Sequence, residues 1–296
     1  MRVTVLGGNG MLGHKFVQVF RERFETSTTV RRGNTDLPPE LTSGVRVVEI
    51  ADVNDAEDLI VTLAATRPDV VVNAVGIVKQ STIATDASVT IATNGILPHR
   101  LARLSAALGF RLIHISTDCV FSGRRGGYSE DDLPDAPDLY GRSKMIGEIA
   151  DDRALTLRTS IIGRELRAIR GLIEWFLSNE GGRARGFRRA IYTGLPTVTF
   201  AAIVAELIER HPRLAGLYNV ASAPIDKCSL LHLVNRSFAA RIEIEPYDGF
   251  VKDMSLDGRR FAAATGIVID PWPALVDTMA SDATHYRRWR GANATD

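Results

Sequence analysis

The sequence has little cysteine and almost no net charge, and each of these absences argues against a class of protein. Its two cysteines, Cys119 and Cys228, are too few for a disulfide framework, and no C-x-x-C pair indicates a zinc site. The formal net charge of +1 gives no general attraction to nucleic acid or to an acidic membrane surface. We therefore expect no metal, no nucleic-acid partner and a reducing, cytoplasmic location.

Long hydrophobic runs are also absent. No apolar segment approaches the roughly 20 residues that a membrane-spanning helix needs. Met1 leads directly into the short apolar run 3–6 without a basic region, so we expect neither a signal peptide nor a membrane span. With 45% hydrophobic and 24% charged residues, the 296-residue chain has the composition of a soluble globular protein of one large or two modest domains.

Strand-like and helix-like segments alternate through the first 165 residues. Strands are predicted at 2–6, 26–30, 45–50, 68–76, 110–116 and 154–162. Helical spacing is found in the segments 7–24, 54–67, 87–109 and 138–150, and Pro98 must kink or interrupt the third of these. Strands that are apolar throughout and separated by helices indicate a parallel sheet covered on both faces.

The pattern loosens after residue 160. Helices are predicted at 171–179 and 198–210, a short strand at 217–222, and a polar, frayed tail over 285–296. We predict an α/β fold with a Rossmann-type doubly wound parallel sheet and a smaller C-terminal substrate-binding lobe. The dinucleotide-binding domain would span 1–165. The lobe would take up most of 166–296, with segments around 195–238 returning to the first domain.

A glycine-rich turn separates the first predicted strand from the first helix. Gly7, Gly10 and Gly13 have the spacing G-x-x-G-x-x-G, and Met11 and Leu12 lie within it. Glycine permits a sharp turn and lets backbone N–H groups approach a pyrophosphate at the helix N-terminus, where the dipole favours anions. The strand–turn–helix context is the required one, so we predict a dinucleotide site; the alternative is a turn without a ligand.

The end of the second predicted strand discriminates between the two nicotinamide cofactors. An acidic residue there would bind the adenosine 2′-hydroxyl of NAD. The strand instead ends in Arg31 and Arg32, whose guanidinium groups suit a 2′-phosphate. The sequence therefore favours NADP(H) over NAD(H), unless both arginines are ordinary solvated charges.

Polar residues follow the apolar strand 110–116, and a helix with a notable pair comes next. Ser116, Thr117 and Asp118 would lie at the carboxyl end of a parallel sheet, where doubly wound folds bind ligands. Tyr140 and Lys144 are four residues apart and share one face of a helix. A nearby ammonium lowers the pKa of a phenol, which could then protonate a carbonyl oxygen as it receives hydride. Because the next helix lies nearer Tyr140, we do not expect Thr117 to cap a helix.

The segment "STDCVFSG…GGYSEDDLPDAPDLYGRSKMIGE" resembles extended short-chain dehydrogenases/reductases, and more narrowly the dTDP-4-dehydrorhamnose reductases and related nucleotide-sugar reductases. The resemblance runs through roughly the first 165 residues and continues more weakly beyond them. It implies NADPH-dependent reduction of a keto group on a nucleotide-activated deoxysugar, with a homodimer left open. It also implies that Thr117 is the hydroxyl of the catalytic set, Tyr140 the acid and Lys144 its partner.

The same resemblance implies a set of cofactor contacts along the sheet edge. They are Gly7, Gly10, Met11, Leu12, Arg31, Arg32, Asp52, Val53, Asn73, Ala74, Val75, Gly76, Ser116, Tyr140, Lys144 and Thr159. Asn94 matches the helix asparagine of the family, and Arg158 and Ser160 flank Thr159 at the strand end beside the nicotinamide.

Some residues depart from the family pattern or have no assigned role. Cys119 stands where the family usually has tyrosine, and we interpret it as a packing residue because no histidine is placed to activate it. Lys79 and Gln80 are candidate sugar contacts. Arg183, Arg185, Arg188 and Arg189 could hold a nucleotide diphosphate or lie in a solvated loop, and both interpretations stay open. The six histidines, His14, His99, His114, His211, His232 and His285, have no ligand-like spacing, and we expect packing or surface roles.

Two other functions remain open. A 4,6-dehydratase of this family typically has Asp-Glu after the threonine, and the missing Glu disfavours elimination. An epimerase would be expected to hold NAD tightly, against which Arg31 and Arg32 argue. A non-catalytic, NADP-binding regulatory subunit is the third hypothesis, since the β subunit of methionine adenosyltransferase resembles the same reductases.

Overall fold

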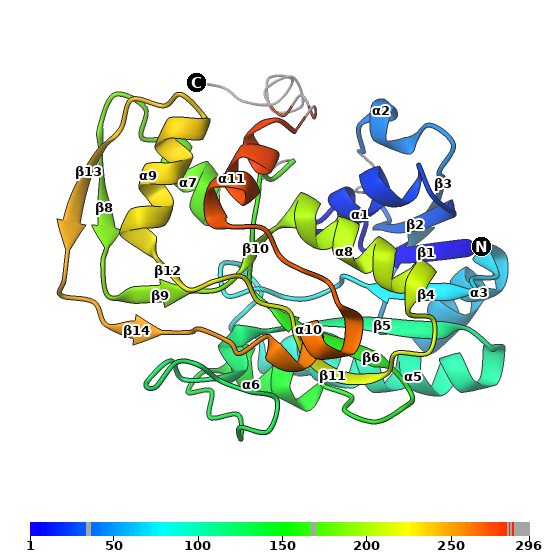
Figure 1. Ribbon diagram of the computed structural model, residues 1–296. Coiled ribbons are helices and arrows are strands. Elements are labelled where there is room, and N and C mark those ends of the chain that lie inside the picture. The colour runs from blue at the N-terminus through cyan, green and yellow to red at the C-terminus, as the bar shows by residue number, and fades with distance from the viewer. Residues whose placement is uncertain (34–36, 167–169, 283, 285, 287–296) are drawn as a thin grey trace.

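A computed structural model describes residues 1–33, 37–166, 170–282, 284 and 286 of the chain. A seven-stranded, wholly parallel sheet with the order β11-β6-β5-β4-β1-β2-β3 forms its centre (Figure 1). The strands are β1 (Arg2–Leu6), β2 (Glu25–Arg31), β3 (Arg46–Ile50), β4 (Val70–Asn73), β5 (Arg111–Thr117), β6 (Leu155–Thr159) and β11 (Gly216–Asn219). Its order reverses at β1, as in a dinucleotide-binding doubly wound sheet. The predicted fold class is confirmed.

Helices cover both faces of this sheet, because strands such as β1, β4 and β5 carry apolar side chains on both sides. On one face, Phe16 and Phe20 of α1 (Gly13–Phe20) pack with Phe200 of α8 (Thr197–Arg210). On the other face, leucines of α3 (Ala56–Thr66) and α5 (Leu97–Leu108) pack on Val71 and Leu112. Two short helices, α2 (Pro39–Thr42) and α4 (Ala87–Ile91), lie in the connections between these elements.

The remaining elements lie mostly to one side of the sheet, at the left of Figure 1. Two parallel strands, β8 (Arg183–Phe187) and β13 (Glu243–Tyr247), pair there with α9 (Lys227–Ser237) packed against them. Shorter strands are β7 (Ile161–Ile162), β9 (Ala190–Tyr192), β10 (Leu195–Pro196), β12 (Ile225–Asp226) and β14 (Lys252–Asp253). The other helices are α7 (Leu172–Leu177), α10 (Arg259–Thr265) and α11 (Trp272–Ala280).

Two predicted segments are each divided in the structure. The single helix expected over 87–109 consists of α4, a π-helical turn (Ala92–Ile96) and α5. Pro98 has no N–H to donate to the carbonyl four residues earlier, and the chain widens into a π turn just before it. The strand expected over 154–162 is broken at Ser160, because β7 leaves the central sheet and pairs with β10.

No helix among the described residues is long and apolar enough to cross a membrane. Most of the tail predicted over 285–296 lies outside the described residues. Tyr286, which belongs to that predicted tail, is described and buried: its hydroxyl hydrogen-bonds to His14 Nε2 at 2.9 Å and donates to Asp282 Oδ2 at 2.9 Å.

Candidate active site

The glycine turn lies at the carboxyl end of β1 and leads directly into α1. Gly7 has a φ of +87°, which favours glycine. A Cβ on Gly13 would collide with the carbonyl oxygen of Gly7, so only glycine lets the helix begin this close to the strand. Gly10 is exposed, Met11 is half-buried and Leu12 is buried beneath the turn. The helix therefore starts at the edge of the sheet, where the positive end of its dipole favours an anion.

Arg31 is the last residue of β2, and both Arg31 and Arg32 are exposed. The backbone N–H of Arg32 donates to the carbonyl of Ile50 at 2.9 Å, which fixes the chain beyond the strand end against β3. Asp52 and Val53 follow β3: Asp52 is exposed and accepts the Asn54 N–H, while Val53 packs at the edge of the apolar core.

The turn after β4 is held by two buried asparagines. Asn73 accepts the Val75 N–H at 3.2 Å and contacts His114 Nδ1 at 3.2 Å. Asn94, which lies in the π turn, accepts the Ile77 N–H at 2.9 Å and donates to the Ile77 carbonyl at 3.0 Å and to Ser143 Oγ at 3.1 Å. Asn94 thus ties the turn 73–77 to helix α6 (Leu139–Ile146).

Ala74 and Gly76 belong to the same turn, Ala74 half-buried and Gly76 exposed. A side chain on Gly76 would lie against Asn94 Oδ1 at 3.4 Å. Sequence reasoning identified Asn94 but not the π turn around it. Such turns are frequent at functional sites, and Pro98 was the available signal.

Thr117 caps a short 3₁₀ turn (Asp118–Val120), so the prediction that it would cap no helix is wrong. Its Oγ1 accepts the Cys119 N–H at 3.1 Å and donates to Asp118 Oδ1 at 3.0 Å. A turn of three residues is too short to show helical periodicity, so it could not be predicted from the sequence pattern. The Thr117 hydroxyl also lowers the pKa of the Tyr140 phenol, so capping does not remove it from the site.

Ser116 is hydrogen-bonded to a buried ion pair near the strand ends. Its Oγ donates to Glu148 Oε1 at 2.7 Å. Arg158 donates to both oxygens of Glu148 at 2.7 Å, and both side chains are buried. In the sheet, Ser116 pairs with Arg158 and Thr117 with Thr159, so these side chains share one edge. Sequence reasoning assigned no role to Glu148, and the final Glu of the "YGRSKMIGE" segment was the signal.

Tyr140 and Lys144 lie on α6, which Asp138 caps by accepting the Gly141 N–H at 2.8 Å. Lys144 is buried and its Nζ donates to the Ile115 carbonyl of β5 at 2.6 Å. Burial lowers the pKa of Lys144 to about 8, and the Glu148 carboxylate opposes that shift.

The expectation that Lys144 lowers the Tyr140 pKa is wrong for the protein alone. Burial raises the pKa of the Tyr140 phenol well above its ordinary value, the nearby Asp118 carboxylate adds to this, and only the Thr117 hydroxyl lowers it. The phenol therefore stays protonated at neutral pH. A protonated phenol beside a hydroxyl can donate its proton to a carbonyl oxygen.

Cys119 is not an activated thiol. Burial and the neighbouring Asp118 raise its pKa to about 12, so the thiolate is negligible at neutral pH. Asp118 is itself buried, and burial raises the pKa of its carboxyl. The interpretation of Cys119 as a packing residue fits this environment.

The basic segment 183–189 forms a strand and turn. Arg183 lies on β8 and is paired with Glu243 and Glu245 of β13, and Arg188 is paired with Asp248. Arg185 lies 5.3 Å from the Tyr247 ring, and Arg189 is exposed in the turn after β8. Thr159 ends β6 and is buried, while Gln80 is exposed beyond the β4 turn.

The five described histidines include two that are fully buried, His14 and His114. His285 lies outside the described residues. Within the described part of the chain, no group of His, Cys, Asp and Glu side chains is arranged to hold a metal ion.

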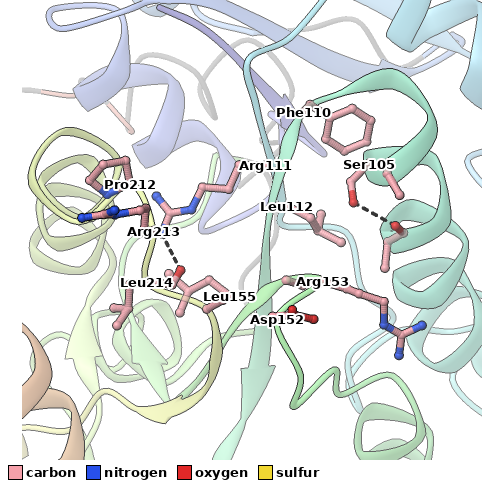
Figure 2. A pocket seen from close by; sticks show the side chains of 14 residues that line it. Ser105, Phe110, Arg111, Leu112, Asp152, Arg153, Leu155, Pro212, Arg213 and Leu214 are labelled. Atoms are coloured by element: carbon pink, nitrogen blue, oxygen red, sulfur yellow. Dashed lines mark hydrogen bonds between the residues drawn. The ribbon is translucent and has the colours of Figure 1, made fainter.

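A cavity of about 410 Å³ lies at the opposite end of the sheet, where β5, β6 and β11 begin (Figure 2). Arg111 points into the gap beside it and donates to the carbonyls of Leu207 and Leu214. Because parallel sheets bind their ligands at the carboxyl ends of the strands, this cavity is separate from the Thr117–Tyr140 site.

A model of the family described as RmlD substrate binding domain matches residues 1–236 of this chain. The dTDP-4-dehydrorhamnose reductase of Streptomyces griseus is 33% identical over 150 residues, which are 50% of this chain and 44% of that protein. A probable dTDP-4,6-dihydroxy-2-methyloxan-3-one 4-ketoreductase of Streptomyces antibioticus is 32% identical over 238 residues, covering 75% of this chain and 72% of that one.

The crystal structure of a hypothetical dTDP-4-dehydrorhamnose reductase from Sulfolobus tokodaii is similar over 92% of this chain and 96% of that chain. The TM-score is 0.74 and the sequence identity 25%. The chain spans about half the length of several of the curated relatives it matches, between 44% and 54%.

Proposed function

The chain belongs to the RmlD substrate binding domain family, and from that premise we propose that it is an NADPH-dependent reductase. Its substrate would be a nucleotide-activated deoxysugar, of which it would reduce a keto group. Such reductions belong to polysaccharide or deoxysugar biosynthesis. The relatives named as reductases of dTDP-linked sugars support this substrate class. The observation that carries the proposal is that the Thr117 hydroxyl lies beside the buried Tyr140 phenol, at the same sheet edge as the glycine turn.

The residues along that edge fit a dinucleotide. The close approach of Gly13 to Gly7 places the turn at the N-terminal end of α1, where the helix dipole favours a pyrophosphate. The exposed guanidinium groups of Arg31 and Arg32 suit a 2′-phosphate. When bound, NADPH would supply the hydride. We propose the cofactor contacts predicted from the sequence, with residues 1–165 as the cofactor domain and most of 166–296 as the substrate lobe.

Tyr140 is the proposed acid, and three features support that role. The phenol is protonated at neutral pH, so that it has a proton to give to the carbonyl oxygen. The Thr117 hydroxyl is within hydrogen-bonding reach of the phenol and would orient the carbonyl. Lys144, with a pKa of about 8, is largely an ammonium at neutral pH and would stabilise the phenolate left after proton transfer.

The alternatives differ in what they consume. An epimerase returns hydride to its substrate and uses no external NADPH, and a regulatory subunit does no chemistry on a sugar. The exposed Arg31 and Arg32 favour a reductase over an epimerase that holds NAD, and the Thr117 hydroxyl beside the Tyr140 phenol favours it over a regulatory subunit. We further propose a cytoplasmic enzyme, in keeping with its two free cysteines.

The test is a pair of variants. In Tyr140→Phe we expect turnover of a keto-sugar to fall at least about a hundredfold, since a positioned general acid contributes roughly 10²–10⁴, while NADPH binding persists. Lys144→Ala should also lose turnover. Turnover by Tyr140→Phe equal to that of the unaltered protein would refute the proposed role of Tyr140.

A further inference from the structure

Lysine is scarce in this chain, and its distribution is informative. Only five of the 36 Lys and Arg residues are lysines: Lys15, Lys79, Lys144, Lys227 and Lys252. The two side chains are not interchangeable, because lysine carries a compact point charge and arginine a planar fork. A chain that uses arginine for almost all of its surface cations retains lysine at few positions, and their places in the fold therefore suggest specific roles.

Four of the five lysines lie at the candidate site. Lys144 lies on α6 with Tyr140. Lys15 is the exception: it lies on α1 and forms a buried ion pair with Asp282. Lys79, Lys227 and Lys252 come from three separate parts of the chain, namely the turn beyond β4, the start of α9 and strand β14. None of the three is explained by the proton transfer described above.

Lys79 lies beside the catalytic phenol. Its Nζ is 5.6 Å from the centre of the Tyr140 ring and 2.6 Å from Asp138 Oδ2. Burial alone would lower the pKa of Lys79, but the hydrogen bond to Asp138 and the charges of Cys119 and Asp118 raise it. Because Asp138 also caps α6, this ion pair fixes an ammonium over the N-terminal turn that presents Tyr140.

Lys227 and Lys252 approach from the C-terminal lobe. Lys227 interacts electrostatically with Asp118 and Cys119, and burial lowers its pKa while Asp118 opposes that shift. Lys252 interacts with Lys227 and with Asp138, and its side chain packs over Gly123. Neither ammonium forms an ion pair with any residue that the structure describes. Their backbones lie on either side of β9, because β12, which ends just before Lys227, and β14, which carries Lys252, both pair with that strand.

The charge balance of this cluster calls for an anion. Asp138 is neutralised by Lys79, and the buried Asp118 carboxylate interacts with Lys227. Among the arginines of the segment 183–189, Arg183 and Arg188 already have carboxylate partners and are less suited to an anionic ligand. The four lysines at the site are opposed by two carboxylates, Asp118 and Asp138, because Glu148 is paired with Arg158. This leaves the surplus of about two positive charges that a diphosphate would complement.

We propose that Lys79, Lys227 and Lys252 form the subsite for the diphosphate of the nucleotide-sugar, with Lys227 and Lys252 as its main contacts. The assignment rests on the proposed function for the identity of the ligand. It makes the C-terminal lobe responsible for placing the substrate diphosphate beside the Thr117–Tyr140 pair. Lys79 would then bridge the diphosphate subsite and the helix that carries the acid.

Calorimetric titration of the full-length protein with TDP, UDP and GDP, each against its own nucleoside, tests this subsite. The unaltered protein should prefer at least one diphosphate over its nucleoside. Lys227→Met and Lys252→Met should each raise the Kd of that diphosphate about tenfold to a hundredfold, since a hydrogen bond to a charged group contributes roughly 1.5–3 kcal/mol. The Kd of the nucleoside should stay within about twofold. Arg213→Met, which removes one charge at the far end of the sheet, is the matched control and should change neither Kd.

Unchanged diphosphate affinity in both lysine variants would overturn the subsite, as would the absence of any preference in the unaltered protein. Lys252 is half-exposed on β14, so its variant serves even where Lys227→Met fails to fold. NADPH oxidation by the same samples separates the two proposals. Reduction of a keto-sugar with unchanged KM in both variants refutes the subsite alone. Lysine-dependent diphosphate binding without any NADPH oxidation refutes the reductase alone.

Discussion

Replacement of Glu148 by glutamine probes the link between the sheet edge and the catalytic helix. Glu148 accepts hydrogen bonds from Ser116 Oγ and from two nitrogens of Arg158, all at 2.7 Å. The side chains of Arg158 and Glu148 are 3% and 7% exposed, so this is a buried ion pair. Glutamine has nearly the same shape but no charge, and the Arg158 guanidinium would remain buried without a counter-charge.

The expected loss of stability is large. Removing one partner of a buried pair typically destabilises a protein by about 3–5 kcal/mol. Glutamine keeps one oxygen acceptor, so we expect about 3 kcal/mol in the free energy of unfolding, measured by urea denaturation. Glu206→Gln is the control: its pair with Arg210 is exposed and contributes below about 0.5 kcal/mol.

The same substitution should alter the pH dependence of catalysis. Burial holds the pKa of Lys144 at about 8, and the Glu148 carboxylate is what keeps it from falling further. Without that carboxylate the ammonium loses its proton at lower pH. The alkaline limb of kcat/KM should therefore move to lower pH in Glu148→Gln and stay in place in Glu206→Gln. An unfolding free energy within about 1 kcal/mol of the unaltered protein, together with an unmoved alkaline limb, would refute this account of Glu148.

Three further predictions concern the cofactor edge and the C-terminal segment. Replacing both Arg31 and Arg32 by alanine should raise the Kd for NADPH at least about tenfold at fixed salt and change that for NADH little, as measured by fluorescence titration; equal losses for both cofactors would contradict the 2′-phosphate assignment. Gly13→Ala should abolish binding of both, because the added Cβ collides with the turn. Asp282→Asn should destabilise the fold by about 3–5 kcal/mol, since it leaves the buried Lys15 unpaired.

The stability that the Lys15–Asp282 ion pair contributes depends on pH. Burial would raise the pKa of Asp282, but the Lys15 ammonium and the surrounding hydrogen bonds bring it down to about 2. The folded-state pKa is thus below the unfolded value of about 3.9. The stabilisation is present above pH 4 and is lost as the pH falls toward 2. In acid, urea denaturation should show the unaltered protein approaching the stability of Asp282→Asn.

The central sheet could be predicted from the sequence because its signals are local. Strands β1, β4 and β5 contain apolar runs, the glycine turn stands between β1 and α1, and the i, i+4 spacing places Tyr140 and Lys144 on one helix face. A carboxyl-end location for Ser116 and Thr117 followed from the parallel topology. These inferences needed no knowledge of contacts between distant segments.

Other features depend on contacts that periodicity does not encode. The lobe pairs β8 with β13 across about 60 residues, which brings Arg183 to two glutamates. The direction of the Tyr140 pKa shift depends on how deeply the phenol is buried, and a sequence gives only its spacing from Lys144. Lys227 and Lys252 reach the site through the fold of the lobe, where the sequence pattern is loose.

The most direct test of the central claim is the initial rate of NADPH oxidation by the purified protein, measured with TDP-, UDP- and GDP-linked 4-keto sugars. We expect steady consumption of NADPH with at least one of these sugars, in proportion to the sugar reduced. In Tyr140→Phe the rate should be lower by at least about a hundredfold. No consumption with any member of the panel, by a protein that binds NADPH, would contradict it.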